Sequence, residues 1–148
     1  MLRPVAESDL EVFYEHQRDP QSVRMGAVAP REYQACLAHW RESLADETVT
    51  ARTIEADGRV AGHVVSFERD GNREVGYWIA REQWGRGVAS AALAAFLADE
   101  DPHRPLVARV AAHNRGSLRV LEKCGFTVTE ELEDPEGDGI DEVRLRLT

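Results

Sequence analysis

The stretch QWGRGVASAALAAF, residues 83–96, places two glycines around an arginine and then begins an alanine-rich run with helical character. Glycine allows a ligand to approach the backbone closely, and the first N–H groups of a helix have no partners inside the helix. The helix dipole favours negative charge at this end, and Arg86 adds a cation. The pattern therefore predicts either a phosphate or pyrophosphate site, or a tight strand-to-helix turn with an exposed arginine.

Two nucleotide-binding motifs are excluded for this stretch. It is not G-x-x-x-x-G-K-[ST], and no lysine lies near it. It is not a G-x-G-x-x-G loop that opens a chain of parallel βαβ units. If the stretch binds a pyrophosphate, that pyrophosphate belongs to another kind of ligand.

The periodicity on either side of this stretch predicts a mixed α+β fold. Residues 48–80 alternate in polarity around two glycine turns and predict a three-stranded antiparallel meander. Residues 18–30, which contain Pro20, Gly26 and Pro30, predict a loop. The remaining segments predict strands at 1–5, 105–112, 126–134 and 141–148, and helices at 7–17, 31–45, 83–96 and 114–125. This order indicates one domain, residues 1–148, with helices on both faces of one sheet.

Composition excludes several classes of function. The formal net charge of −9 disfavours a nucleic-acid partner, because such proteins neutralise phosphates with a basic face. No apolar run approaches the roughly 20 residues of a membrane span, and the chain does not begin like a signal peptide. Cys36 and Cys124 show no metal-like spacing, and neither do the five histidines. We therefore expect buried thiols, no metal and a cytoplasmic protein.

Two motifs together resemble those of a known family. The segments EVGYWIAREQWGRGVASAAL (74–93) and VAAHNRGSLRVLEKCGF (110–126) resemble the GNAT family of N-acetyltransferases, and most closely its branch that acetylates the N-termini of ribosomal proteins. The family's [RQ]-x-x-G-x-[GA] loop falls on residues 84–89, with Trp84 in its first position. The expected order of elements also matches that fold. The resemblance implies acetyl-CoA as co-substrate and a sheet with a splayed central strand pair.

The resemblance assigns the residues that bind coenzyme A. The pantetheine arm is expected to lie between the splayed strands 73–80 and 106–112 and to pair with backbone near Trp78, Ile79 and Ala80. The pyrophosphate is expected on the backbone of the glycine loop, at Gly85, Arg86, Gly87, Val88, Ala89 and Ser90.

Asn114 and Ser117 match the family's N-x-x-S motif at the start of the following helix. By resemblance, Asn114 bonds the pantetheine amides and Ser117 reaches the sulfur. Residue type alone favours helix capping for both. Three basic residues on the same helix either meet the 3′-phosphate or form a solvated face: Arg115, Arg119 and Lys123.

Acetyl transfer to an amine needs an oxyanion donor, a proton for the leaving thiolate and a base for the amine. The resemblance places the oxyanion donor on backbone near Ile79, and Ser117 is the candidate donor to the thiolate. Glu74 is the candidate base, acting through water, or else an exposed strand carboxylate. His63 either faces the substrate or is an ordinary polar residue of a strand. Three aromatic residues are candidate walls of an acceptor pocket, although the helical spacing of the first favours the core: Trp40, Tyr77 and Trp78.

The sequence thus predicts an N-acetyltransferase that acetylates a primary amine of a small molecule or a peptide N-terminus by direct attack. A monomer and a homodimer both remain open. The alternatives are a non-catalytic acyl-CoA-binding module and a transferase that uses another acyl group. By resemblance, the acceptor pocket is built largely from about residues 8–45 and from the last strands, and neither region shows a diagnostic motif.

Overall fold

A computed structural model describes all 148 residues. None of its helices is both long and apolar enough to span a membrane. The strands are β1 (Leu2–Pro4), β2 (Thr50–Ala56), β3 (Arg59–Arg69), β4 (Asn72–Ile79), β5 (Leu106–Ala111), β6 (Thr127–Leu132) and β7 (Glu142–Leu147). The helices are α1 (Asp9–Gln17), α2 (Pro20–Gly26), α3 (Tyr33–Ala45), α4 (Val88–Ala95) and α5 (Arg115–Lys123), with a 3₁₀ turn at Arg81–Gln83 and a π-helical turn at Phe96–Glu100.

All seven strands form one sheet in the order β1-β2-β3-β4-β5-β7-β6. Every neighbouring pair is antiparallel except β4 and β5, which are parallel. The three-stranded meander is therefore β2-β3-β4, and β6 and β7 form the closing pair. The mixed α+β fold class predicted from the sequence is confirmed.

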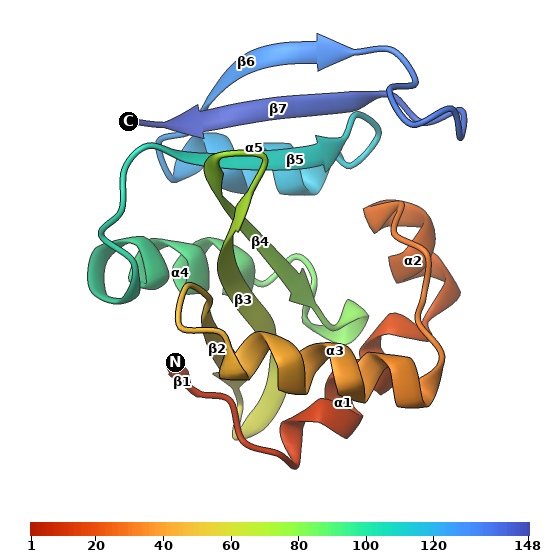
Figure 1. Ribbon diagram of the computed structural model, residues 1–148, viewed down its shortest axis with the longest axis vertical. Coiled ribbons are helices and arrows are strands. Elements are labelled where there is room, and N and C mark those ends of the chain that lie inside the picture. The colour runs from red at the N-terminus through yellow and green to blue at the C-terminus, as the bar shows by residue number, and fades with distance from the viewer.

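The two central strands separate soon after they meet. Strands β4 and β5 are in register only at Arg73 with Leu106 and at Glu74 with Val107, although β4 continues to Ile79. Figure 1 shows β4 leaving β5 at a steep angle, with α2 beside the opening. The splayed strand pair expected from the family resemblance is therefore present, and beyond Glu74 the facing edges of both strands lack a sheet partner.

Two hydrophobic clusters lie on opposite faces of the sheet. One face carries α1 and α3, whose Leu10, Phe13 and Trp40 pack toward the β3 side chains of Val60 and Val65. The other face carries α4 and α5, whose apolar residues form one cluster with Ala61, Val64 and Val75 of β3 and β4. Because successive strand residues point to opposite faces, the meander has apolar residues on both sides. Helices on both faces were predicted, and this is confirmed.

The loop predicted for residues 18–30 is wrong in part, because α2 lies within it. Asp19 caps this helix: its carboxylate accepts hydrogen bonds from the Ser22 backbone N–H at 3.0 Å and from the Ser22 hydroxyl at 2.8 Å. Pro20 occupies the first helical position, where a missing N–H costs nothing, and Gly26 ends the helix. The same two residues that indicate a loop are also the ordinary ends of a short helix. This helix borders the site described next.

Candidate active site

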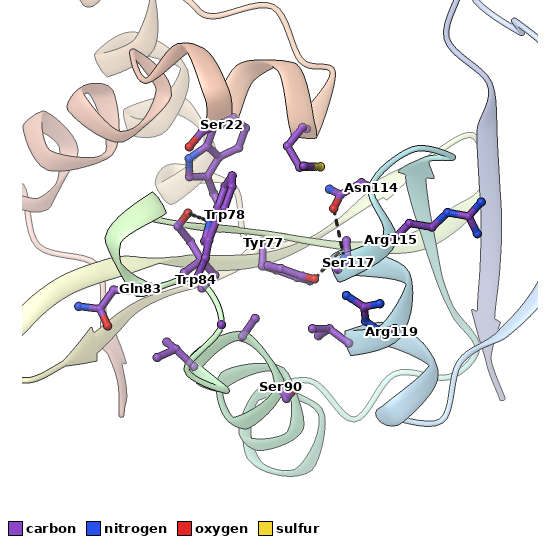
Figure 2. Close-up of a pocket in the computed structure, with 18 of the residues that line it drawn as sticks. Ser22, Tyr77, Trp78, Gln83, Trp84, Ser90, Asn114, Arg115, Ser117 and Arg119 are labelled. Atoms are coloured by element: carbon purple, nitrogen blue, oxygen red, sulfur yellow. Dashed lines mark hydrogen bonds between the residues drawn. The ribbon is translucent and has the colours of Figure 1, made fainter.

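A cavity of about 810 Å³ opens where β4 and β5 separate. Its walls come from α2, the second half of β4, the glycine loop with the start of α4, the end of β5 and α5. Figure 2 shows the Tyr77 hydroxyl pointing at Ser117 and bonded to it, with Ser22 and Trp78 at the α2 end and Ser90 at the α4 end. Most of the residues predicted to form the site thus surround one space.

The glycine loop opens directly onto this cavity. Gly85 and Gly87 have φ angles of 74° and 77°, in the left-handed region that favours glycine. A Cβ built at either position would have no atom within 4 Å, so the space beside both residues is open. Gly87 is the N-cap of α4, and no side chain caps that helix. The first N–H groups of α4 are therefore available to an anionic ligand, and the pyrophosphate site expected on this loop stays a prediction. Three further loop residues predicted to bind it also line the cavity: Val88, Ala89 and Ser90.

The positive charge of the site comes from α5 and not from Arg86. Arg86 does not line the cavity; its guanidinium pairs with the Asp57 carboxylate at 3.0 Å and is largely exposed. The structure therefore does not bring the Arg86 side chain to the predicted phosphate position. Three other cations line the cavity at four-residue intervals and form no ion pair with any carboxylate: Arg115, Arg119 and Lys123. Like charges at this spacing repel along a helix, and a polyanionic ligand relieves that repulsion.

Backbone groups of β4 near the cavity divide into two sets. The Ala80 N–H donates to the Ala61 carbonyl at 2.8 Å, so Ala80 is paired with the neighbouring strand and does not line the cavity. Because antiparallel bonding alternates, Tyr77 and Ile79 direct their N–H groups toward the gap beside β5, whereas Trp78 directs its own toward β3. Ile79 is therefore the better placed donor of the three predicted residues, and Trp78 lines the cavity through its side chain.

Trp84 replaces the family's arginine or glutamine at the start of the loop, and its indole has a structural role. The Trp84 Nε1–H donates to the Ile79 carbonyl at 2.9 Å. This bond fastens the glycine loop to the end of β4. It also occupies the Ile79 carbonyl, which leaves the N–H as the group of Ile79 that faces the gap.

Tyr77 and Ser117 form a hydroxyl pair inside the cavity. Their oxygens are 2.9 Å apart, and either hydroxyl can be the donor. Burial raises the pKa of Tyr77, and the hydrogen bond with Ser117 offsets part of that effect. Tyr77 therefore keeps its proton near neutral pH. The sequence suggested Tyr77 only as a pocket wall; its contact with Ser117 joins residues 40 positions apart and was not foreseen.

Asn114 is both a helix cap and part of the cavity wall. Its side-chain oxygen accepts a hydrogen bond from the Ser117 backbone N–H at 3.2 Å, as an N-cap residue does. The side-chain amide of Asn114 makes no other bond, and the residue lines the cavity. Capping and ligand binding, which the sequence left as alternatives, are therefore compatible in one side chain.

Glu74 is not brought to the cavity. Its side chain is 8% exposed, and its carboxylate lies 3.0 Å from the Arg109 guanidinium, with Arg69 at 3.6 Å. Burial raises the pKa of Glu74, while the two arginines act in the opposite direction. The carboxylate thus belongs to a buried ion-pair cluster at the point where β4 and β5 still pair, and Glu74 does not line the cavity.

His113 is a cavity residue that sequence reasoning missed. Its Nε2 lies 2.8 Å from the backbone carbonyl of Arg24 in α2. A carbonyl oxygen only accepts hydrogen bonds, so Nε2 carries the proton, and in the neutral ring Nδ1 holds a free lone pair. The bond also ties α2 to the end of β5. No sequence signal marked this residue beyond its place directly before Asn114.

His63 and Trp40 lie outside the cavity. The His63 ring packs 4.8 Å from the ring of Phe13 and 4.6 Å from that of Trp40, measured between centroids. Burial, with smaller contributions from His16 and His39, lowers the pKa of His63 from 6.5 to about 3. His63 is therefore a neutral residue that packs against the α1–α3 core, which agrees with the plainer of its two predicted roles.

Comparisons with known proteins agree with this geometry. Residues 1–127 match the sequence model of the acetyltransferase (GNAT) domain. No curated protein matches the chain. The fold resembles a spermidine N-acetyltransferase from Vibrio cholerae in complex with CoA and spermine, with a TM-score of 0.86 and 19% identity over 99% of this chain and 94% of that one. It also resembles the aminoglycoside acetyltransferase AAC(6')-Ib in complex with coenzyme A, with a TM-score of 0.80 and 22% identity over 100% of this chain and 94% of that one.

A third similar structure is an acetyltransferase of the GNAT family from Bacillus anthracis, with a TM-score of 0.80 and 17% identity over 99% of this chain and 92% of that one. At these identities the structures establish the fold alone. The sequence match covers most of the chain and establishes the family. With its splayed strands, open glycine loop and N-x-x-S helix start, the chain belongs to the GNAT family of acetyltransferases.

Proposed function

We propose that the protein transfers the acetyl group of acetyl-CoA to a primary amine by direct attack, without a covalent enzyme intermediate. One observation carries this proposal: an open glycine loop at a helix start, three unpaired cations and a hydroxyl pair all line one cavity between β4 and β5. The loop and the cations suit the phosphates of coenzyme A. The hydroxyl pair suits the sulfur end of the same molecule.

The residues of the cavity divide the chemistry among them. The Ile79 N–H stabilises the negative charge that develops on the thioester oxygen when the amine attacks. His113 Nδ1 takes the proton that the amine loses, because His113 lines the cavity and its Nε2–H is already bonded to Arg24, which leaves the Nδ1 lone pair free. As the carbon–sulfur bond breaks, Ser117 gives its proton to the thiolate, and Tyr77 gives its own to Ser117. Asn114 holds the pantetheine arm.

The acceptor in this proposal is a small-molecule amine or a peptide N-terminus. Structures with this fold include acetyltransferases named for spermidine and for aminoglycosides, so the fold accommodates amine acceptors. The resemblance of the two motifs to enzymes that acetylate ribosomal-protein N-termini supports a peptide amine. Both kinds of acceptor present the same reacting group to the cavity.

The test combines binding with turnover. Acetyl-CoA at about 100 times its dissociation constant is expected to add about 2.7 kcal/mol to the free energy of unfolding, whereas NAD and ATP add much less. With a panel of amines, free thiol is released only when an acceptor is present. A melting temperature that millimolar acetyl-CoA does not change contradicts the whole proposal. Stabilisation without thiol release from any amine indicates an acyl-CoA-binding module instead.

A further inference from the structure

The acceptor end of the cavity is separate from the coenzyme A end. The glycine loop, the start of α4 and the length of α5 surround the positions suited to phosphate and pantetheine. On the α2 side the wall includes Ser22, Met25 and Gly26, the Trp78 ring, which lies against Gly26, and His113, which is bonded to Arg24 of α2. Figure 2 shows Ser22 and Trp78 together at this end, on the side away from Arg119. With coenzyme A along the glycine loop and α5, as the proposed function requires, the α2 side of the cavity is the part left for an acceptor amine.

No carboxylate lines this space. The chain contains 27 aspartate and glutamate residues, yet the cavity wall contains none, while three arginine or lysine residues line its coenzyme A end. The wall at the acceptor end carries a hydroxyl, a thioether, an indole and an imidazole that donates its Nε2 proton to α2. An acidic protein thus presents a neutral, partly aromatic surface to its acceptor.

The carboxylate of α2 nearest in sequence to this wall is already paired. Asp19 accepts bonds from the Ser22 backbone and hydroxyl and lies 3.1 Å from the Arg81 guanidinium. The Asp19 carboxylate caps the start of α2 and forms an ion pair with Arg81. Asp19 does not line the cavity. Neither the cavity wall nor Asp19 therefore offers an unpaired carboxylate to a second positive charge on an acceptor.

We infer that the acceptor carries a single amino group on an uncharged, apolar or aromatic frame, and that polyamines and aminoglycosides are poor acceptors. This inference rests on the proposed function and concerns the same cavity. The reacting amine attacks in its neutral form, and His113 takes the proton that its nitrogen loses as the amide bond forms. Every further ammonium group would have to leave water without a partner, which is costly. An apolar frame instead gains by covering Trp78 and Met25.

Binding and turnover of two groups of amines test the inference. Phenethylamine and tryptamine carry one amine on an aromatic frame, and an uncharged tripeptide amide with an apolar first residue carries the same chemistry on a peptide. Spermidine and kanamycin are the polycations. Calorimetry on the protein saturated with CoA is expected to show affinity for at least one member of the first group at least tenfold above that for either polycation. The ratio of kcat/KM should follow the same order. A comparison of the kcat/KM values for the tripeptide and for the two small amines shows whether the acceptor is a peptide N-terminus or a small molecule.

A pair of variants tests the cause. Met25→Glu places a carboxylate in the neutral wall, and Met25→Gln places a side chain of the same shape without the charge. The affinity of the CoA complex for spermidine is expected to rise about tenfold in Met25→Glu relative to Met25→Gln. The affinity for phenethylamine, which has one amine, should rise less between these two variants than the affinity for spermidine. Equal affinities of the two variants for spermidine would show that the missing carboxylate is not what excludes polycations.

The outcomes separate this inference from the proposed function. If CoA binds and the polycations bind or react as well as the monoamines, the acceptor class is wrong and the proposed function stands. If none of the monoamines or peptides binds to the CoA complex, the acceptor class is also overturned. If the monoamines bind in the expected order and no thiol is released, the acceptor class holds and the catalytic part of the proposed function fails.

Discussion

The Tyr77 hydroxyl lies 2.9 Å from the Ser117 hydroxyl, and this contact joins the splayed strand β4 to the first turn of α5. A serine alone is a weak acid, whereas a phenol that keeps its proton is a stronger one. The pair therefore provides a route by which a proton reaches the leaving thiolate through Ser117. Both residues line the cavity, one on each side.

Ser117→Ala is expected to lower kcat by between tenfold and about 10²-fold and to leave the KM for acetyl-CoA nearly unchanged, because the serine acts in the transition state. Tyr77→Phe removes the second hydroxyl and is expected to lower kcat by about tenfold. The double variant should lose little more than Ser117→Ala, since both hydroxyls serve one proton transfer. Steady-state kinetics of the three variants measure this. Losses that multiply in the double variant would show that the two residues act independently.

The bond between Asn114 and the Ser117 N–H allows capping and ligand binding to be separated. Asn114→Asp keeps the capping oxygen and removes the amide donor. We expect an unchanged melting temperature and a raised KM for acetyl-CoA. Asn114→Ala removes both groups and should also cost about 1 kcal/mol of folding free energy. If Asn114→Asp has normal kinetics, Asn114 is a cap and the pantetheine contact does not exist.

Gly87 allows a test of the phosphate site with a matched control. Gly87→Asp places a negative charge in the open space at the start of α4, where it opposes a phosphate. The asparagine of Gly87→Asn is the same size as aspartate. Both side chains should destabilise the fold to a similar extent at the φ of 77°, which Asp and Asn tolerate better than other side chains do. We expect similar melting temperatures for the two variants and much weaker coenzyme A binding in Gly87→Asp. Equal affinities of the two variants for coenzyme A would show that the loop is only a turn and does not bind phosphate.

The hydrogen bond from His113 to the Arg24 carbonyl gives this residue two separable roles. The substitution His113→Gln retains an N–H donor for α2 but leaves no basic nitrogen. If His113 is the general base, His113→Gln and His113→Ala both lose about 10²-fold or more in kcat/KM, and added imidazole restores part of the activity of His113→Ala. If His113 only fastens α2, His113→Gln keeps most of the activity. Amine acetylation rates, measured with and without imidazole, distinguish the two roles.

Local motifs account for what the sequence predicted well. The glycine loop and the N-x-x-S helix start are each contiguous, and the structure places both on one cavity because each begins a helix beside the gap between β4 and β5. The alternation of apolar and polar residues in 48–80 predicted the meander, because successive residues of a strand point to opposite faces of the sheet. The fold class and the two helical faces follow from these local patterns.

Contacts between distant residues account for what the sequence could not predict. The Arg86 side chain pairs with Asp57, which lies 29 positions away in the sequence, and Glu74 forms an ion pair with Arg109. No local pattern reveals either partner. The bond between His113 and Arg24 spans 89 residues and depends on α2, a helix that Pro20 and Gly26 made look like a loop. The sequence thus named Arg86 and Glu74, whose side chains do not line the cavity, and gave His113 no role. It did name Arg115, Arg119 and Lys123 as possible phosphate contacts, and all three line the cavity.

The packing of His63 against Phe13 and Trp40 predicts that acid destabilises the fold. Burial, followed by the nearby His16 and His39, lowers the pKa of His63 from 6.5 to about 3, and its Nδ1 is buried without a hydrogen-bond partner. Between pH 3 and 6.5 the unfolded chain therefore binds more protons at this residue than the folded chain does. The contribution of His63 to stability is present above pH 6.5 and is lost as the pH falls through this window.

A variant isolates this contribution from that of the carboxylates. One proton of difference corresponds to a slope of about 1.4 kcal/mol per pH unit in the free energy of unfolding. His63→Leu has a side chain of similar size that does not titrate. Urea unfolding at a series of pH values between about 4 and 7 is expected to give a steeper fall in the wild type than in His63→Leu, by up to about that slope. Near neutral pH the free energies of unfolding of the two proteins should differ by a constant amount, which comes from the different packing of the two side chains. Parallel curves over the whole range would show that His63 accepts a proton in the folded protein as readily as in the unfolded chain.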